Sequence, residues 1–267
     1  NSSPCVVVKL CLGVPSDPDS VGHRQVPEVD WQRPCFMPWA QWGEPVLNHW
    51  RAGRSLPDAL NQPPPPHRIM RFVPQQTLPA GVAYESHVFS LGEIPTRELA
   101  HDFFNGLGWL RFPRTKRQLN RWQADAIAHD GVGPHRGRLR DAITLFDENA
   151  ALWCAPEPMW QALTHKDWHS LFVMHRGQWA NTHLVLFGHA LLEKLLQPFK
   201  GITAHVLTVP MPPLSSDDEV DDWLCQQLST EMLADKPFAP LPLAGIPGWW
   251  PNNHAPEFLE DKKVFRD

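Results

Sequence analysis

Residues 138–155 read Arg-Leu-Arg-Asp-Ala-Ile-Thr-Leu-Phe-Asp-Glu-Asn-Ala-Ala-Leu-Trp-Cys-Ala, and this stretch contains both kinds of element that the chain uses. Its first half places Leu139, Ala142, Ile143 and Phe146 on one face of a helix. Its second half, residues 150–155, is a candidate strand. Together they indicate a fold that combines helices with some β structure.

Apolar residues at helical spacing continue on both sides of this stretch. The predicted helical stripes are Leu99, Phe103 and Leu107; Leu119, Trp122 and Ala126; Trp160 and Leu163; Trp168, Leu171 and Phe172; and Val220, Leu224, Leu228 and Met232. Ser216 begins a Ser-Asp-Asp-Glu capping box before the last stripe. Residues 184–196 are the most apolar segment and end before Pro198, which predicts a further, largely buried helix.

Strand signals are fewer than helix signals. Residues 202–209 are rich in β-formers and lie between Gly201 and Pro210, so they predict one clear strand. Strands and helices do not alternate, which argues against a doubly wound sheet. The expected fold class is therefore mainly α (α+β), with a helical core and a small β element.

The N-terminal part is expected to be irregular. Residues 1–28 have no periodicity and are interpreted as a loose tail, and residues 29–267 as a single globular domain. Residues 29–95 are rich in Trp and Pro and contain few clear elements, and the four prolines of residues 63–66 predict a rigid, extended spacer. The 13 Trp residues indicate either a Trp-rich core or an aromatic ligand platform.

Composition restricts the class of protein. The net charge of -5 gives no overall basic signature for nucleic acid binding. The five Cys form no C-x-x-C pair, which argues against a disulfide framework and against a thiolate zinc site. No apolar run reaches about 18 residues, so no membrane span is expected. We expect reduced thiols and a cytoplasmic location.

Four segments in this order resemble an uncharacterised bacterial family catalogued as Domain of Unknown Function 3025. They are residues 104–116, 138–149, 187–195 and 245–251, the last reading Gly-Ile-Pro-Gly-Trp-Trp-Pro. The likeness extends from about Asp30 to the C-terminus. It implies a bacterial protein of proteobacterial origin. No established activity and no catalytic residue come with the resemblance.

Two acidic groups in the sequence are candidates for chemistry. Asp147 and Glu148, followed by Asn149, end a predicted helix, where the helix dipole disfavours carboxylates. They are either a structural turn paired with Arg140 or an acid/base or metal-binding pair. His189 and Glu193 share one face of the most apolar segment, so they are either one metal site or a core histidine bonded to its neighbour.

His205, in the middle of the predicted strand, is a candidate third ligand. With His189, Glu193 and a carboxylate from Asp147 or Glu148 it would form a set suited to one divalent transition metal, non-haem iron or zinc. The zinc motif H-E-x-x-H is absent, which lowers the case for a metal. The short turn after Pro198 would return the strand alongside the preceding helix.

A basic cluster is the last candidate site. Its expected ligand-binding residues are Arg111, Arg114, Lys116, Arg138 and Arg140. Guanidinium groups match phosphate and carboxylate, so the cluster could bind a small anionic ligand. Alternatively, it pairs with the acidic residues 217–235 or is solvated. Nucleic acid binding through residues 111–140 is the weakest interpretation, because the interleaved aromatic rings fit a core better.

Two classes of function therefore remain open. In the first, the chain is an enzyme whose polar pocket, built from the carboxylate and histidine candidates and rimmed by Arg138 and Arg140, supports hydrolysis or another metal-assisted step. In the second, it is a binding or interaction protein whose polar residues form a structural network. The sequence contains no nucleophile elbow, no P-loop and no G-x-G-x-x-G motif that would decide between them.

Overall fold

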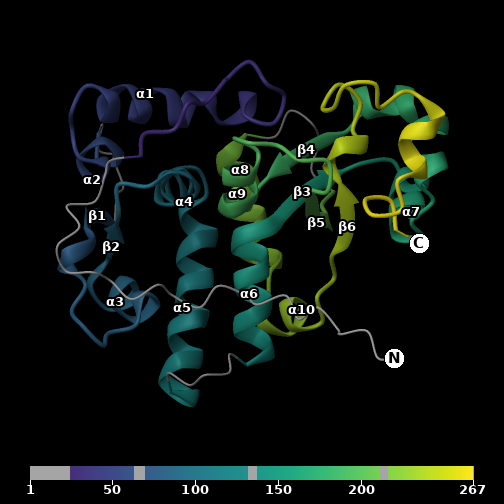
Figure 1. Ribbon diagram of the computed structural model, residues 1–267. Helices are drawn as coiled ribbons and strands as arrows, with labels where there is room; N and C mark the ends of the chain where they lie inside the picture. Colours follow the sequence, from purple (N-terminus) through teal and green to yellow (C-terminus); the bar gives the residue numbers. More distant parts are fainter. Residues whose placement is uncertain (1–24, 63–69, 132–136, 211–215, 267) are drawn as a thin grey trace, which may run out of the picture.

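The computed structural model describes residues 25–62, 70–131, 137–210 and 216–266 (Figure 1). It confirms the expected fold class, mainly helical with small sheets. The helices are α1 (Ala40–Arg51), α2 (Leu56–Leu60), α3 (Tyr84–Leu91), α4 (Ala100–Arg111), α5 (Pro113–Asp130), α6 (Arg138–Asn149), α7 (Glu157–Thr164), α8 (His189–Lys194), α9 (Asp217–Gln227) and α10 (Thr230–Ala234). The strands are β1 (Arg71–Pro74), β2 (Glu93–Thr96), β3 (Ala150–Cys154), β4 (His183–Leu186), β5 (Thr203–Thr208) and β6 (Ala239–Pro242).

Two small sheets lie on opposite sides of the central helices α4, α5 and α6 (Figure 1). On one side β1 and β2 form a parallel pair. On the other, a mixed sheet has the order β4-β3-β5-β6, with β3 parallel to β5 and the other pairs antiparallel. The C-terminal segment, yellow in Figure 1, lies beside α7.

Most of the predicted elements are confirmed. The stripes before and after residue 113 belong to α4 and α5, the quoted stretch forms α6 followed at once by β3, and residues 203–208 form β5. The capping box at Ser216 begins α9, with the Ser216 side chain accepting from the backbone of Glu219 and the Glu219 side chain accepting in return. The chain leaves the helical conformation after Gln227, and Met232 lies on the separate helix α10.

The prediction of one helix over residues 184–196 is wrong. Residues 183–186 form β4, which pairs antiparallel with β3, and only residues 189–194 are helical. An apolar run this short is compatible with either a helix or a strand. Pairing with the apolar strand β3 stabilises the strand conformation. Similarly, the helix expected around Trp168 consists of a π-helical turn (Ser170–Met174) and a 3₁₀ segment (Arg176–Asn181).

The Trp- and Pro-rich segment contains more regular structure than its sequence indicates. It holds α1, α2, α3 and both strands of the small sheet. The proline spacer, and the predicted tail up to residue 24, lie outside the described residues. The rest of that tail contacts the folded part, since the Gln25 backbone N–H donates to the Glu98 carbonyl and Arg51 donates to the Pro27 carbonyl. The division into a tail and a single domain stays a prediction.

Tryptophans occupy the core in stacked groups. The rings of Trp153 and Trp179 stack with centroids 5.1 Å apart, and Phe172 stacks on Trp179 at 5.8 Å. Trp39, Trp50 and Trp153 are fully buried. This packing supports the Trp-rich core rather than the aromatic platform. Among the described residues, no helix is long and apolar enough to cross a membrane.

The turn from β4 to α8 brings two distant segments together. The backbone N–H groups of Phe187 and Gly188 both donate to the Ala150 carbonyl, at 3.0 and 2.9 Å. Gly188 therefore lies against the end of α6, and the next residue, His189, lies beside Asp147. A Cβ atom on Gly188 would come within 2.3 Å of the Glu148 carbonyl oxygen and 2.5 Å of the Asn149 nitrogen.

Substituting Gly188 by alanine is expected to lower the free energy of unfolding by about 1–3 kcal/mol, because backbone atoms cannot rotate away from the new methyl group. Urea unfolding would measure the loss. Gly177→Ala, where a Cβ meets nothing within 4 Å, is the matched control. Equal stabilities for the two variants would contradict the close approach.

Candidate functional site

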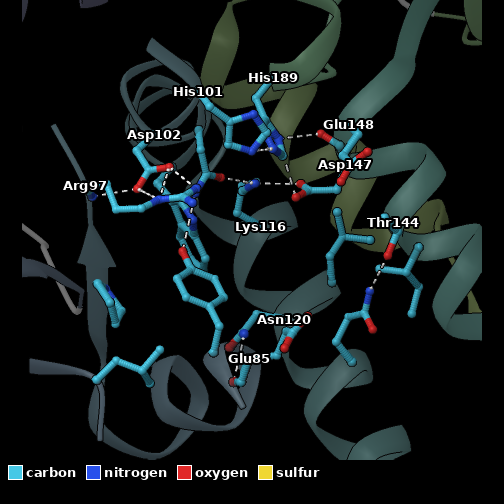
Figure 2. A pocket seen from close by; sticks show the side chains of 18 of the residues that line it. Glu85, Arg97, His101, Asp102, Lys116, Asn120, Thr144, Asp147, Glu148 and His189 are labelled. Carbon is cyan, nitrogen blue, oxygen red and sulfur yellow. Dashed lines mark hydrogen bonds and ion pairs between the residues drawn. The ribbon is translucent and has the colours of Figure 1, made fainter. Parts of the chain in front are cut away.

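A polar cavity of about 350 Å³ lies between α3, α4, α5 and α6 (Figure 2). Gln75 and Leu78 from the segment after β1, residues from the end of β2 and the first residue of α8 complete its wall. Each long helix contributes side chains at spacings of three or four, which place them on one face. These are His101, Asn105 and Trp109 from α4; Lys116, Asn120 and Gln123 from α5; and Thr144, Asp147 and Glu148 from α6.

Two histidines meet ring to ring at this cavity (Figure 2). The Nε2 atoms of His101 and His189 are 3.2 Å apart, and the rings are nearly perpendicular with centroids 4.7 Å apart. The other nitrogen of each ring is also engaged. His101 Nδ1 lies 2.8 Å from the Glu193 carboxylate, and His189 Nδ1 lies 2.8 Å from the Asp147 carbonyl oxygen.

These contacts fix where the protons lie. A carboxylate and a carbonyl can only accept, so both Nδ1 atoms must carry hydrogen. If both rings were neutral, each Nε2 would then present a lone pair to the other at 3.2 Å. A hydrogen bond between the rings requires one more proton, which makes one of the two histidines a cation with both nitrogens protonated.

The surroundings assign that charge to His101. Its hydrogen bond to Glu193 raises the pKa of His101 and outweighs the opposing effect of burial. His189 is buried, and its desolvation lowers its pKa to about 3, against the attraction of Asp147. These opposite directions favour His101 as the proton donor and neutral His189 as the acceptor. Two neighbouring groups with pKa values moved in opposite directions are typical of an acid/base pair.

An ion pair between buried Lys116 and half-buried Asp147 supports the same wall of the cavity. The Lys116 ammonium donates to Asp147 at 2.6 Å and to the Asn105 amide oxygen at 2.8 Å. Burial would raise the pKa of Asp147, but the charge and hydrogen bond of Lys116, together with the charge of His101, hold it below its ordinary value. Asn105 in turn donates to the Tyr84 hydroxyl at 3.3 Å. The network links α3, α4, α5 and α6 around the cavity.

Replacing Lys116 by methionine is expected to lower the free energy of unfolding by about 3 kcal/mol, because Asp147 would then keep its charge without its main partner. The stem of the side chain is retained, so lost packing contributes little. Chemical denaturation of Lys116→Met, Asp147→Asn and the double variant would measure the coupling. Additive losses in the double variant would contradict the direct interaction.

A second ion pair forms the rim. Arg97 donates to both carboxylate oxygens of Asp102, the shortest contact being 2.7 Å, and its backbone N–H donates to the same carboxylate at 2.6 Å. Asp102 lies in the first turn of α4, where the helix dipole favours an anion. The pair fixes the start of α4 and hence the position of His101.

The structure brings some of the predicted catalytic residues together. Asp147, Glu148 and His189 line the cavity, as does Lys116 from the predicted basic cluster. Glu193 bonds to His101 rather than to His189, its neighbour on the helix. The roles proposed for these residues stay predictions.

The predicted metal site does not assemble. Over the part of the chain that the structure describes, no group of three or more His, Cys, Asp or Glu side chains could hold a metal ion. His205 lies on β5 between Ala150 and Pro240, and its ring contacts Phe238. The predicted placement of this strand alongside the preceding helix is not what the structure has: β5 pairs with β3 and β6, whereas α8 packs mainly against α4 and α6.

Most of the predicted anion-binding residues are engaged elsewhere, as the structural alternative expected. Arg111 is buried, pairs with Asp217 at 2.7 Å and lies over the Trp39 ring. Arg114 pairs with Asp218. The remaining three predicted residues are Arg138, exposed at the start of α6; Arg140, which donates to Gln123; and Asn149, which accepts from Lys194.

The acidic segment also caps α5. The Asp221 carboxylate accepts from the backbone N–H groups of Arg114 and Thr115, both at 2.9 Å. These groups have no partner within the helix, because they belong to its first turn. Residues 217–221 therefore stabilise the start of α5 in two ways, through the ion pair of Asp218 with Arg114 and through capping of the backbone N–H groups by Asp221.

His101 is the main residue that sequence reasoning missed. It stands next to the apolar stripe of α4, and its proton acceptor is 88 positions away in the sequence. A signal existed in the second, polar stripe, since His101 and Asn105 are four apart on α4, and Lys116, Asn120 and Gln123 follow at spacings of four and three on α5. The residue that joins His101 to the site could not be identified before the β4 to α8 turn was known.

Comparison with known proteins places the chain in a family. The family described as "Protein of unknown function (DUF3025)" matches residues 70–267, about three quarters of the chain. The chain belongs to this family. The match begins later than the likeness in the sequence suggested, leaving out α1 and α2, but it includes every residue of the histidine pair and its partners. No curated protein and no solved structure is similar enough to the chain to match it.

Proposed function

We propose that this protein is a cytoplasmic bacterial enzyme that hydrolyses a small, polar substrate by acid–base catalysis, with His101 as the proton donor. One observation carries the proposal: two imidazole Nε2 atoms face each other at 3.2 Å beside a cavity, and both Nδ1 atoms are committed to acceptors. Such a pair holds one transferable proton at a defined place. General acid catalysis by a positioned histidine contributes about 10²–10⁴-fold to a rate.

The proton can leave the pair in one direction. About a third of the His101 side chain is accessible, whereas His189 is buried. A substrate atom that becomes a leaving group would accept the Nε2 proton of His101 as its bond breaks. The proton released by the attacking water then returns to the pair, which restores the starting state. Glu193 stabilises the cation before transfer, and the Asp147 carbonyl keeps His189 in the tautomer that leaves its Nε2 free to accept.

The charges of the cavity favour an uncharged substrate. Its wall carries cationic Arg97, Lys116 and His101, and four acidic side chains oppose them. These are Glu85, Asp102, Asp147 and Glu148. Because positive and negative side chains nearly balance in number, the cavity attracts a strongly anionic ligand only weakly. The basic cluster predicted from the sequence would attract such a ligand strongly. Amide and hydroxyl groups from Asn105, Asn120, Gln123 and Thr144 supply hydrogen bonds that a hydroxyl- or amide-bearing molecule would use.

Nitrogen NMR of protein labelled with ¹⁵N-histidine tests the proton arrangement directly. At pH 7 we expect His101 to give two protonated nitrogens and His189 to give a neutral ring protonated at Nδ1. His101→Gln and His189→Gln assign the signals, and His205→Gln, outside the cavity, is the control.

Two results would contradict the proposal. One is two neutral rings at pH 7. The other is a stoichiometric transition metal in the purified protein by elemental analysis, because a metal ion between the Nε2 atoms would replace the shared proton.

A further inference from the structure

A second cavity, of about 490 Å³, lies between α3 and α5 and contains none of the histidine pair. Its apolar part is formed by Met70, Val88, Phe89 and Leu91, and its volume is within the roughly 300–1,000 Å³ of small-molecule sites. We call this cavity the α3–α5 groove. Phe89 and Leu91 are 52% and 63% exposed, which is unusual for side chains of this size next to a cavity. A ligand with an apolar portion would cover them.

The other wall of the groove is basic. Arg114, Arg117 and Arg121 follow one another along α5 at spacings of three and four, so they share one face of the helix. Arg114 is held by Asp218 and Asp221. Neither Arg117 nor Arg121 forms an ion pair with any residue that the structure describes. Like charges four apart on a helix repel each other, and an anion between them would remove that repulsion.

From these two walls we propose that the α3–α5 groove binds a free medium-chain carboxylate, with its hydrocarbon chain against Phe89 and Leu91 and its carboxylate between Arg117 and Arg121. Guanidinium groups bind carboxylates through paired hydrogen bonds, which suits the Arg117–Arg121 face. Of the anion-binding residues predicted from the sequence, only Arg114 lines this groove, so the proposed carboxylate site differs from the predicted basic cluster. The inference does not depend on the proposed hydrolytic function.

Isothermal titration of the full chain with monomeric decanoate tests the proposal. We expect saturable binding of one molecule per chain. Octanoate should bind about fifteenfold more weakly, because each buried methylene contributes roughly a fourfold change in affinity. Arg117→Gln and Arg121→Gln should each weaken decanoate binding at least tenfold, and decanol should bind less tightly than decanoate.

Arg138→Gln is the matched control, since Arg138 is an exposed arginine at the start of α6 that does not line the groove. All three arginines are exposed, so the variants are expected to fold normally. The proposal is overturned by the absence of saturable binding at millimolar decanoate, or by Arg117→Gln and Arg121→Gln behaving like Arg138→Gln. Binding to anionic vesicles without binding of free decanoate would also overturn it, because the site would then recognise a membrane surface.

Discussion

Under the proposed function, replacing His101 by glutamine is expected to lower the rate of hydrolysis by about 10²–10⁴-fold on a substrate that the wild-type protein cleaves, the usual contribution of a positioned general acid. Glutamine can still donate to His189 or to Glu193, but it has no proton to give up at neutral pH. The effect should fall on kcat more than on KM, because the proton moves only as the bond breaks. A panel of small ester, amide and glycoside substrates would first identify an activity of the wild-type protein.

The pH profile separates a positioning role from a structural one. Glu193→Gln removes the hydrogen bond that raises the pKa of His101, so the alkaline limb of the rate profile should move to lower pH. Substituting His205 by glutamine leaves the cavity intact, and its rate should match that of the wild type. If His205→Gln lost as much activity as His101→Gln, or if the Glu193→Gln profile kept its alkaline limb, the assignment of His101 as the acid would be wrong.

The helical part of the fold could be predicted from the sequence because its signals are local. The stripe of α6, the capping box of α9 and the β-rich run of β5 each depend on residues a few positions apart. The segment around β4 could not, since Leu184–Leu186 are equally compatible with a helix. Their conformation depends on pairing with β3, which is an interaction between segments about 30 residues apart.

The candidate site was predicted in part for a similar reason. Asp147 and His189 stood out because a carboxylate at a helix C-terminus and a histidine in an apolar segment each need a partner. The sequence assigned those partners by proximity along the chain, which gave Glu193 to His189. In the structure the partners come from other helices, since Lys116 binds Asp147 and His101 binds both Glu193 and His189. A local energetic argument identified residues that require a partner without identifying the partner.

Below neutral pH, His189 should make the protein lose stability steeply. Its pKa is about 3 in the folded state, against about 6.5 when unfolded, so between these values the unfolded chain binds a proton that the folded chain does not. The free energy of unfolding therefore falls as the pH decreases from about 6.5 towards 3. At pH 4 the loss attributable to His189 amounts to about 3 kcal/mol.

The variant His189→Asn isolates this contribution, because its side-chain amide can still donate to the Asp147 carbonyl but does not titrate. His101 acts with the opposite sign: its raised pKa stabilises the folded state at low pH, and this stabilisation is lost as the pH rises through that pKa. Asp147, whose lowered pKa also costs stability at low pH, is present in both proteins. Urea unfolding of the wild type and His189→Asn at pH 7, 5.5 and 4 should therefore give curves that converge as the pH falls. Parallel curves would mean that His189 is not held neutral in the folded protein, and the acceptor in the histidine pair would then have to be reassigned.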